Sequence, residues 1–344
     1  MKMKLAVFAV TTLTSFSTLA CIHFQIESNG SFINGRSMEF GVNTKNWESL
    51  PSEFFIYKKG SKFINNIPAS KYGFAGIRTY DNLVTEGVNE KGVSMAVLWF
   101  ASGEYPDNKK LKNSIPNTHL LNWGLGQFSS AKDIVENLKK LNVYAPIVKN
   151  LGGQAPIHFS ITDASGANYV VEFINKEIKI FDNTKNRVLT NDPRFDQQLS
   201  QLDQLYKKNP NLKNINTAGE FNNLSGGYGS TQRFQKISVL KSLLPKATNN
   251  VMAVNQSIGL LNNIDYPRGV PTYAEDVNQG RGDAKQETTW ISVIDLKNLK
   301  YYYRTSTNYN VKVVDLKKVG FNNSVQFNLF NDSSRFIDVT PKIK

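Results

Sequence analysis

Only one cysteine, Cys21, occurs among the 344 residues, so the chain has no means of forming an internal disulfide. Its fold must therefore be held together by a packed core rather than by covalent cross-links. The length allows such a core, because removal of residues 1–20 leaves 324 residues, enough for one large domain or two small ones.

The first twenty residues have the features of a secretory signal peptide. Two early lysines precede an apolar run that begins at residues 5–10, and Thr18 and Ala20 offer small side chains at the −3 and −1 positions of a cleavage site. The apolar run is too short to span a bilayer, which takes ~20 residues. We therefore predict cleavage before Cys21, a single mature domain over residues 21–344, and export to the periplasm, with an extracellular destination as the alternative.

Cleavage at this position places a thiol and a free α-amino group on one residue. An α-amino group with a pKa of ~7.7–8.0 is a suitable general base for a thiol with a pKa of ~8.5. Lipoprotein signals also place a cysteine first after the cut, so a lipid-anchored protein is the alternative. Thr18 and Leu19 do not match the leucine and small residue that such signals favour. Cys21 is therefore the candidate nucleophile.

The charge and the remaining motifs exclude several classes of function. Lysine and arginine number 41 against 28 acidic residues, a net charge of +13 that attracts anions. The basic residues are scattered and accompany no nucleic-acid motif, so we predict no nucleic-acid partner. Three histidines without metal-ligand spacing predict neither a metal nor a cofactor. The glycine-rich segment 225–230 lacks the lysine of a phosphate-binding loop and is interpreted as a bent loop.

Hydrophobic periodicity predicts an α+β fold with two antiparallel sheets and helices outside them. No internal repeat or transmembrane segment interrupts it, and residues 262–288 are predicted to form a long loop. The predicted helices are 119–128, 131–141 (capped by Ser130), 195–207, 233–244 and 251–261. The predicted strands are 21–26, 83–88, 93–100, 157–162, 167–174, 178–181, 289–295, 299–305 and 311–314.

Five short blocks occur in order along the predicted mature chain. They are Cys21 itself, Gly-Arg-Ser-Met-Glu at 35–39, Glu-Gly-Val-Asn-Glu-Lys-Gly at 86–92, Leu-Thr-Asn-Asp-Pro-Arg-Phe-Asp at 189–196, and Ser-Thr-Gln-Arg-Phe at 230–234. With these blocks the chain resembles the choloylglycine hydrolase/penicillin V acylase family of linear-amide C–N hydrolases. The resemblance implies a four-layer αββα sandwich, an N-terminal-nucleophile hydrolase fold, and small-molecule amides as substrates. It also implies a homo-oligomer, a tetramer in many relatives.

The resemblance assigns a role to five residues. Cys21 is the nucleophile and, through its amine, the base, while Arg36 lies beside the thiol and tunes it. Glu39 takes the place of an aspartate that hydrogen-bonds the α-amino group, so its side chain is one methylene longer. Asn191 donates to the oxyanion hole, and Arg233 supports the pair that Cys21 and Asn191 form. Taken singly, each of the last four also has an ordinary interpretation. Arg36 and Glu39 could form a surface ion pair, Asn191 could begin a turn, and Arg233 could be a solvated side chain.

Two aromatic residues suggest which branch of the family the chain resembles. Trp99 stands where bile salt hydrolases typically carry asparagine, and its backbone N–H is the expected second oxyanion donor. With Phe40, it predicts an aromatic substrate pocket suited to apolar acyl groups. The pattern is closer to Gram-negative penicillin V acylases, with bile salt hydrolase and acyl-homoserine-lactone acylase activities as alternatives. Trp99 within an apolar strand is also typical of a core residue.

We predict that the intact mass of the protein purified from an exporting host corresponds to an unmodified chain beginning at Cys21. Such a mass leaves both the thiol and the α-amino group free. A mass that includes lipid on Cys21, or a cut beyond it, would contradict the interpretation of Cys21 as a nucleophile.

Overall fold

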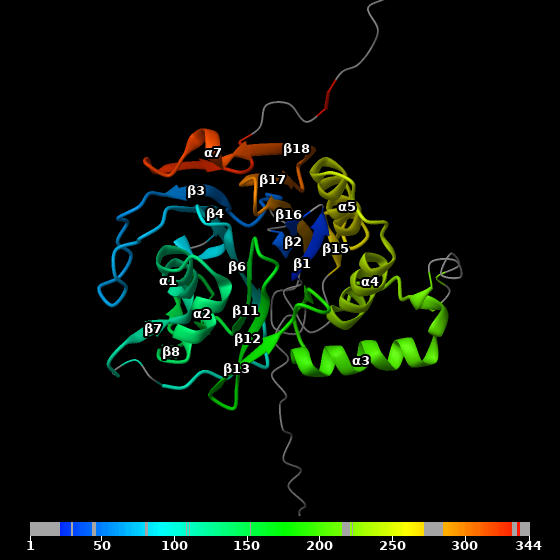
Figure 1. Ribbon diagram of the computed structural model, residues 1–344, viewed down its shortest axis with the longest axis horizontal. Helices are drawn as coiled ribbons and strands as arrows, with labels where there is room; N and C mark the ends of the chain where they lie inside the picture. The colour runs from blue at the N-terminus through cyan, green and yellow to red at the C-terminus, as the bar shows by residue number, and fades with distance from the viewer. Residues whose placement is uncertain are drawn as a thin grey trace, which may run out of the picture.

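Two large antiparallel sheets pack face to face in the computed structural model of the chain (Figure 1). The structure describes residues 21–337 except 29, 43–45, 80–81, 108, 110, 152, 215–220, 222, 272–284 and 332–335. The predicted signal peptide, residues 1–20, lies outside the described residues.

The first sheet contains the N-terminal strand of the described chain, one strand in from its edge. Its strand order is β14-β1-β2-β16-β17-β18, and the short β15 also pairs with β16. The bounds are β1 Cys21–Ser28, β2 Ser31–Val42, β14 Val188–Leu189, β15 Val270–Pro271, β16 Lys285–Asp295, β17 Lys300–Thr305 and β18 Asn308–Asp315.

The second sheet has the strand order β13-β12-β11-β6-β5-β4-β3-β19. The bounds are β3 Glu53–Tyr57, β4 Phe74–Arg78, β5 Val84–Asn89, β6 Val93–Trp99, β11 Ile157–Asp163, β12 Asn168–Ile174, β13 Glu177–Asp182 and β19 Val325–Asn328. Two small two-stranded sheets accompany it, formed by β7 Ser114–Pro116 with β8 Asn142–Tyr144 and by β9 Ile147–Val148 with β10 Gly153–Gln154.

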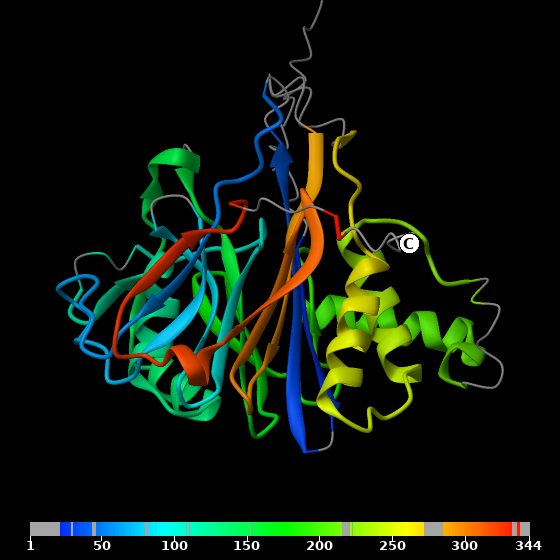
Figure 2. The ribbon, with the colours of Figure 1, turned by 90° about the horizontal axis from the view of Figure 1, so that it is seen from above.

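Helices cover the outer face of each sheet, so the layers follow the order helix, sheet, sheet, helix (Figure 2). Helices α4 and α5 pack on β1, β2 and β16 of the first sheet, and α3 packs on α4; α1 and α2 pack on the second sheet. The bounds are α1 Leu120–Gln127, α2 Ala131–Leu138, α3 Phe195–Lys208, α4 Ser230–Leu243, α5 Asn250–Asn262 and α7 Leu316–Val319, with short 3-10 turns at Asn117–His119, Lys149–Leu151 and Pro210–Lys213. The predicted αββα sandwich is confirmed.

Alternation along the central strands decides which side chains face the second sheet. His23 of β1 contacts Ser160 of β11 at 2.9 Å, and Asn34 of β2 donates to Thr162 at 2.8 Å, so these positions point between the sheets. Their neighbours in sequence, such as Phe24, point to the opposite face, which the helices cover. Burial lowers the pKa of His23 to about 3, so the ring is neutral there. A layer of buried polar bonds thus joins the two sheets.

Most of the predicted elements are present, with ends that differ by a few residues. The Ser130 hydroxyl accepts from the Asp133 N–H at 3.0 Å and caps α2, as predicted. The predicted loop at 262–288 is wrong at its C-terminal end, because β16 already begins at Lys285, and its residues 272–284 lie outside the described residues. Residues 285–288 are polar, and pairing with β2 over their whole length makes them a strand. Within the described ranges, no helix has the length and apolar run needed to cross a membrane.

Gly35 is predicted to be essential for packing α4 and α5 onto the first sheet. A Cβ atom at this position would lie 2.3 Å from Cζ of the buried Phe24 ring. We expect Gly35→Ala to lower the free energy of unfolding by about 2 kcal/mol through overpacking.

The matched control is Gly41→Ala in the same strand, where the nearest atom, the Lys285 carbonyl oxygen, is 3.9 Å from the new Cβ. Urea unfolding of both variants measures the difference. Equal stabilities would contradict the proposed packing constraint.

Candidate active site

Cys21 is the first residue of β1 and lies buried between the two sheets. Its strand pairs with β2 so that Cys21 is opposite Met38, and the Cys21 Sγ is 3.6 Å from the Met38 Sδ. Pairing with β2 fixes the backbone of Cys21. The thiol therefore has a defined direction, toward the second sheet.

The Asn191 side chain contacts both Cys21 and Arg233. Its side-chain oxygen accepts from the Cys21 main-chain nitrogen at 2.6 Å and from Nη2 of Arg233 at 2.9 Å. Because both partners are donors, the atom between them must be the amide oxygen. The amide nitrogen then donates to the Trp99 carbonyl oxygen at 2.8 Å. Asn191 thus links β1, α4 and the end of β6.

Arg233, in the first turn of α4, makes three hydrogen bonds that hold this arrangement. Its Nη1 donates to the Cys21 carbonyl oxygen at 2.7 Å, and its Nε donates to the Tyr228 carbonyl oxygen at 2.8 Å. The third bond is the one to Asn191. The side chain is fully buried, so its bonds to Cys21 and Asn191 form away from water, where charge-assisted hydrogen bonds are strong.

Arg36 lies on the other side of Cys21, between the sheets. Its Nη1 donates to the Thr85 carbonyl oxygen at 2.8 Å, its Nε is 3.9 Å from the Glu86 carboxylate, and its guanidinium lies 5.4 Å from the centre of the Trp290 ring. Tyr301 donates its hydroxyl proton to Glu86 in the same buried cluster. Arg36 is therefore a buried, partly compensated cation, not a surface ion pair with Glu39.

The thiol has a raised pKa despite its cationic neighbours. Burial raises the pKa of Cys21, Arg36 opposes this rise, Glu39 adds to it, and Arg233 lowers the pKa. Because the pKa is raised overall, the thiol is protonated at neutral pH. A nucleophilic role for Cys21 consequently requires a nearby base.

Glu39 lies on the face of β2 that the helices cover, because it is three positions after Arg36 and the side chains of a strand alternate between faces. It is fully buried, and Thr288 donates to its carboxylate at 3.3 Å. Burial raises the pKa of the Glu39 carboxyl from 4.5 to about 7, although Arg233 lowers it. The hydrogen bond of the Cys21 nitrogen that the structure shows goes to Asn191.

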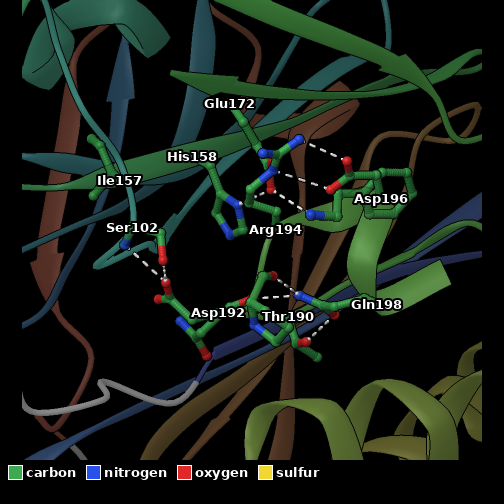
Figure 3. Close-up of polar contacts among 12 residues, drawn as sticks. Ser102, Ile157, His158, Glu172, Thr190, Asp192, Arg194, Asp196 and Gln198 are labelled. Atoms are coloured by element: carbon green, nitrogen blue, oxygen red, sulfur yellow. Dashed lines mark hydrogen bonds and ion pairs between the residues drawn. The ribbon is translucent and has the colours of Figure 1, made fainter. Parts of the chain in front are cut away.

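The segment that carries Asn191 is anchored on both sides (Figure 3). The Asp192 carboxylate accepts from the N–H groups of Ala101 and Ser102 at 2.7 and 2.8 Å and from the Ser102 hydroxyl at 2.5 Å. On the other side, Nε2 of Gln198 donates to the carbonyl oxygens of Asn191 and Pro193, at 2.5 and 2.7 Å. The backbone around Asn191 is therefore held by five hydrogen bonds.

Trp99 ends β6, with its carbonyl oxygen directed at Asn191. The next residue, Phe100, donates its N–H to Pro156 on the opposite edge of the strand. Because neighbouring residues of a strand direct their N–H and C=O groups to alternate edges, the Trp99 N–H points to the same side as its carbonyl. Both polar backbone groups of Trp99 therefore face the Cys21 side of the strand.

A cavity opens at Cys21 and is lined mainly by apolar side chains. Phe40 and Trp99 are both part of its wall, and the polar side-chain groups among the described lining residues are two threonine hydroxyls, the Cys21 thiol and the Trp99 indole N–H. The lining residues are Cys21, Met38, Phe40, Leu50, Thr79, Leu83, Thr85, Val97, Leu98, Trp99, Val148, Leu151, Ala155 and Ile157. Such a wall suits an apolar group bound beside the thiol.

Sequence reasoning missed several residues that support the site. Glu86, Trp290 and Tyr301 surround Arg36, and Asp192 and Gln198 hold the Asn191 segment. Two of these, Glu86 and Asp192, lay within quoted motifs, which was a usable signal. In the part of the chain that the structure describes, no three histidine, cysteine or acidic side chains converge as they would around a metal ion.

Residues 21–328 match the model of the linear amide C-N hydrolases, choloylglycine hydrolase family, so the chain belongs to this family of hydrolases. It is 28% identical over 334 residues to a penicillin V acylase of Pectobacterium atrosepticum, covering 90% of this chain and 84% of the relative. It is also 28% identical over 318 residues to a bile salt hydrolase/transferase of Clostridium perfringens, covering 87% and 93%. The family and the enzyme class predicted from the five sequence blocks are confirmed.

Solved structures show the same fold. A variant of the conjugated bile acid hydrolase from Clostridium perfringens superposes with a TM-score of 0.74 at 22% identity, covering 93% of this chain and 100% of that one. A penicillin V acylase from Agrobacterium tumefaciens gives 0.70 at 24% identity, covering 87% and 86%.

Glu39 is predicted to make stability depend on pH. Its carboxyl has a pKa of about 7 in the folded protein and about 4.5 when unfolded, so folding favours the protonated form. This stabilisation is complete below pH 4.5 and is lost as the pH rises through 7. Relative to Glu39→Gln, the wild-type free energy of unfolding should fall by up to about 3 kcal/mol over this range.

Urea unfolding at several pH values tests this expectation. The control is Glu136→Gln, which alters an exposed carboxylate paired with Lys132. A Glu39→Gln variant with the wild-type pH dependence would contradict the raised pKa.

Proposed function

We propose that the chain is an exported hydrolase that uses an N-terminal Cys21 to cleave a linear amide with an apolar acyl group. The observation that carries the proposal is the hydrogen-bonded set of Cys21, Asn191 and Arg233, in which Cys21 also lines an apolar cavity. The match of the family model begins at Cys21, which supports cleavage after Ala20. The periplasm is the proposed destination and a homotetramer the proposed assembly.

In the proposed mechanism the α-amino group of Cys21 is the base that the buried thiol requires. With a pKa of ~7.7–8.0 it is partly neutral at physiological pH and accepts the thiol proton. The hydrogen bond to Asn191 orients the nitrogen. The thiolate then attacks the amide carbonyl carbon, and the ammonium returns its proton to the departing amine. A thioester on Cys21 remains, and the amine next activates a water molecule that hydrolyses it.

Asn191 and Trp99 are the proposed donors to the oxyanion. An amide nitrogen carries two N–H groups, and only one of those on Asn191 is needed for its bond to the Trp99 carbonyl. The second, together with the Trp99 N–H, is proposed to bind the negative oxygen of the tetrahedral intermediate. Arg233 holds Asn191 in place for this role.

The two remaining charged residues are proposed to adjust the nucleophile. Arg36 lowers the pKa of the Cys21 thiol by its positive charge and so assists proton removal. Glu39, which raises the same pKa, is proposed to stabilise the cationic form of the α-amino group at longer range. Arg36 is thus proposed to favour the negatively charged thiolate, and Glu39 to favour the positively charged amine.

The cavity favours a penicillin V acylase-like substrate over a bile salt. Its aromatic residues Phe40 and Trp99 give flat apolar walls that suit a phenoxyacetyl or fatty acyl group. Bile salt hydrolysis is the second candidate, because a bile salt hydrolase/transferase is as similar in sequence as the penicillin V acylase, and the net positive charge attracts its anionic substrates. An acyl-homoserine-lactone acylase and a non-catalytic lipid-anchored binding protein are the further alternatives.

We expect the protein to hydrolyse penicillin V or a long-chain acyl-homoserine lactone faster than glycocholate in parallel assays.

We expect Cys21→Ala to lose activity by a factor on the order of 10⁵ or more, because the nucleophile is absent. Acid quenching followed by mass spectrometry should show an acylated wild-type chain and no acylated Cys21→Ala chain.

Iodoacetamide supplies the matched chemical control, since Cys21 is the only thiol in the chain. Faster hydrolysis of glycocholate would favour the bile salt alternative. Full activity after complete alkylation of Cys21 would overturn the proposed mechanism.

A further inference from the structure

We propose that Asp192 is a positioning residue that holds the two oxyanion donors, Asn191 and Trp99, at a fixed separation. The inference rests on the proposed function and extends it to a residue outside the Cys21, Asn191 and Arg233 set. Asp192 follows one donor directly in sequence, and its carboxylate binds the backbone just beyond the other.

The Asp192 carboxylate uses both of its oxygens on one short segment. One oxygen accepts from the Ala101 N–H at 2.7 Å, and the other accepts from the Ser102 N–H at 2.8 Å and from the Ser102 hydroxyl at 2.5 Å. Figure 3 shows Asp192 directed toward Ser102. These charge-assisted bonds join segments about ninety residues apart in the chain.

The bonds close a ring that contains both proposed donors. On one side of the ring the Asn191 amide nitrogen donates to the Trp99 carbonyl at 2.8 Å. On the other side Asp192 binds the backbone two and three residues after Trp99. The Asn191–Trp99 bond and the Asp192 bonds connect the two segments at two points. The segments therefore cannot pivot about the Asn191–Trp99 bond alone. The distance between the two donors is thereby fixed before a substrate arrives.

Two other carboxylates close to Asp192 lack this geometry. Asp196, in the first turn of α3, is exposed and pairs with the Arg194 guanidinium at 2.7 Å. Glu172 is buried and accepts from the Phe195 N–H at 2.9 Å and contacts His158 at 3.1 Å, so it fixes the start of α3 (Figure 3). Of these three carboxylates, only Asp192 binds the chain that follows Trp99.

The proposed role predicts an effect on the chemical step and not on substrate binding. The oxyanion forms only in the tetrahedral intermediate, so a displaced donor weakens the transition state more than the ground state. The variant Asp192→Asn keeps the size of the side chain but places an NH₂ group against a backbone N–H. We expect kcat to fall by about tenfold or more, since small displacements of catalytic groups have effects up to about a hundredfold.

The experiment compares wild type, Asp192→Asn and the control Asp196→Asn in steady-state kinetics on penicillin V or on the best amide of the panel. We expect Asp192→Asn to lower kcat with KM within about twofold, and Asp196→Asn to retain both values. The rate of Cys21 alkylation by iodoacetamide should be the same in all three proteins, because alkylation forms no oxyanion. Urea unfolding reports whether each variant is folded.

A folded Asp192→Asn variant with wild-type kcat would overturn the positioning role, as would a parallel loss of kcat and alkylation rate, which indicates damage to the nucleophile. If this variant does not fold, Ser102→Ala removes one of the three bonds, and we expect a drop in kcat of about threefold. An unchanged kcat in folded Ser102→Ala would then overturn the role. A wild-type protein inactive on every amide would instead overturn the proposed function, and the inference with it.

Discussion

The buried guanidinium of Arg233 is the interaction on which the arrangement of the site depends. Its hydrogen bonds reach the Cys21 carbonyl, the Asn191 side chain and the Tyr228 carbonyl, which come from a strand, a loop and the segment before α4. A buried cation is costly unless its donors are satisfied, so these partners cannot separate without exposing or orphaning the charge. Because separation would leave the buried charge without partners, Arg233 keeps β1, the Asn191 loop and the start of α4 together. The bond from Arg233 orients the Asn191 side chain, while the Asp192 and Gln198 hydrogen bonds hold its backbone.

The period of two along β2 divides the charges around Cys21 into two groups. Arg36 and Met38 point between the sheets, where the thiol lies, while Glu39 points toward the helices. Arg36 therefore acts on the thiol from the inter-sheet layer, and Glu39 and Arg233 act on it from the helix side. This division explains how a cation and an anion near one residue avoid neutralising each other in a direct ion pair.

Periodicity and short motifs predicted much of the fold and the identity of the central residues. Alternating strands such as β1, and the Ser130 cap of α2, depend on local sequence and were predictable for that reason. The polar start of β16 was not, because pairing with β2 and not hydrophobicity makes it a strand. The contacts of Asp192 with Ser102 and of Glu86 with Tyr301 were also beyond reach, since they join residues far apart in the chain. The direction of side chains was also not predicted. Arg36 and Glu39 are close in sequence, but their positions in β2 place them on opposite faces of the sheet.

The raised pKa of the thiol connects the chemistry of the site with the proposed processing of the chain. Burial keeps the Cys21 sulfur protonated, and the cationic neighbours do not reverse this. In a chain that still carries residues 1–20, the Cys21 nitrogen is part of a peptide bond, which has no basic lone pair. The proposed cleavage after Ala20 would convert this nitrogen into an amine next to Asn191, whose side-chain oxygen accepts the Cys21 N–H at 2.6 Å. In this proposal the fold supplies the hydrogen-bond partner of the nitrogen, and removal of residues 1–20 supplies the base.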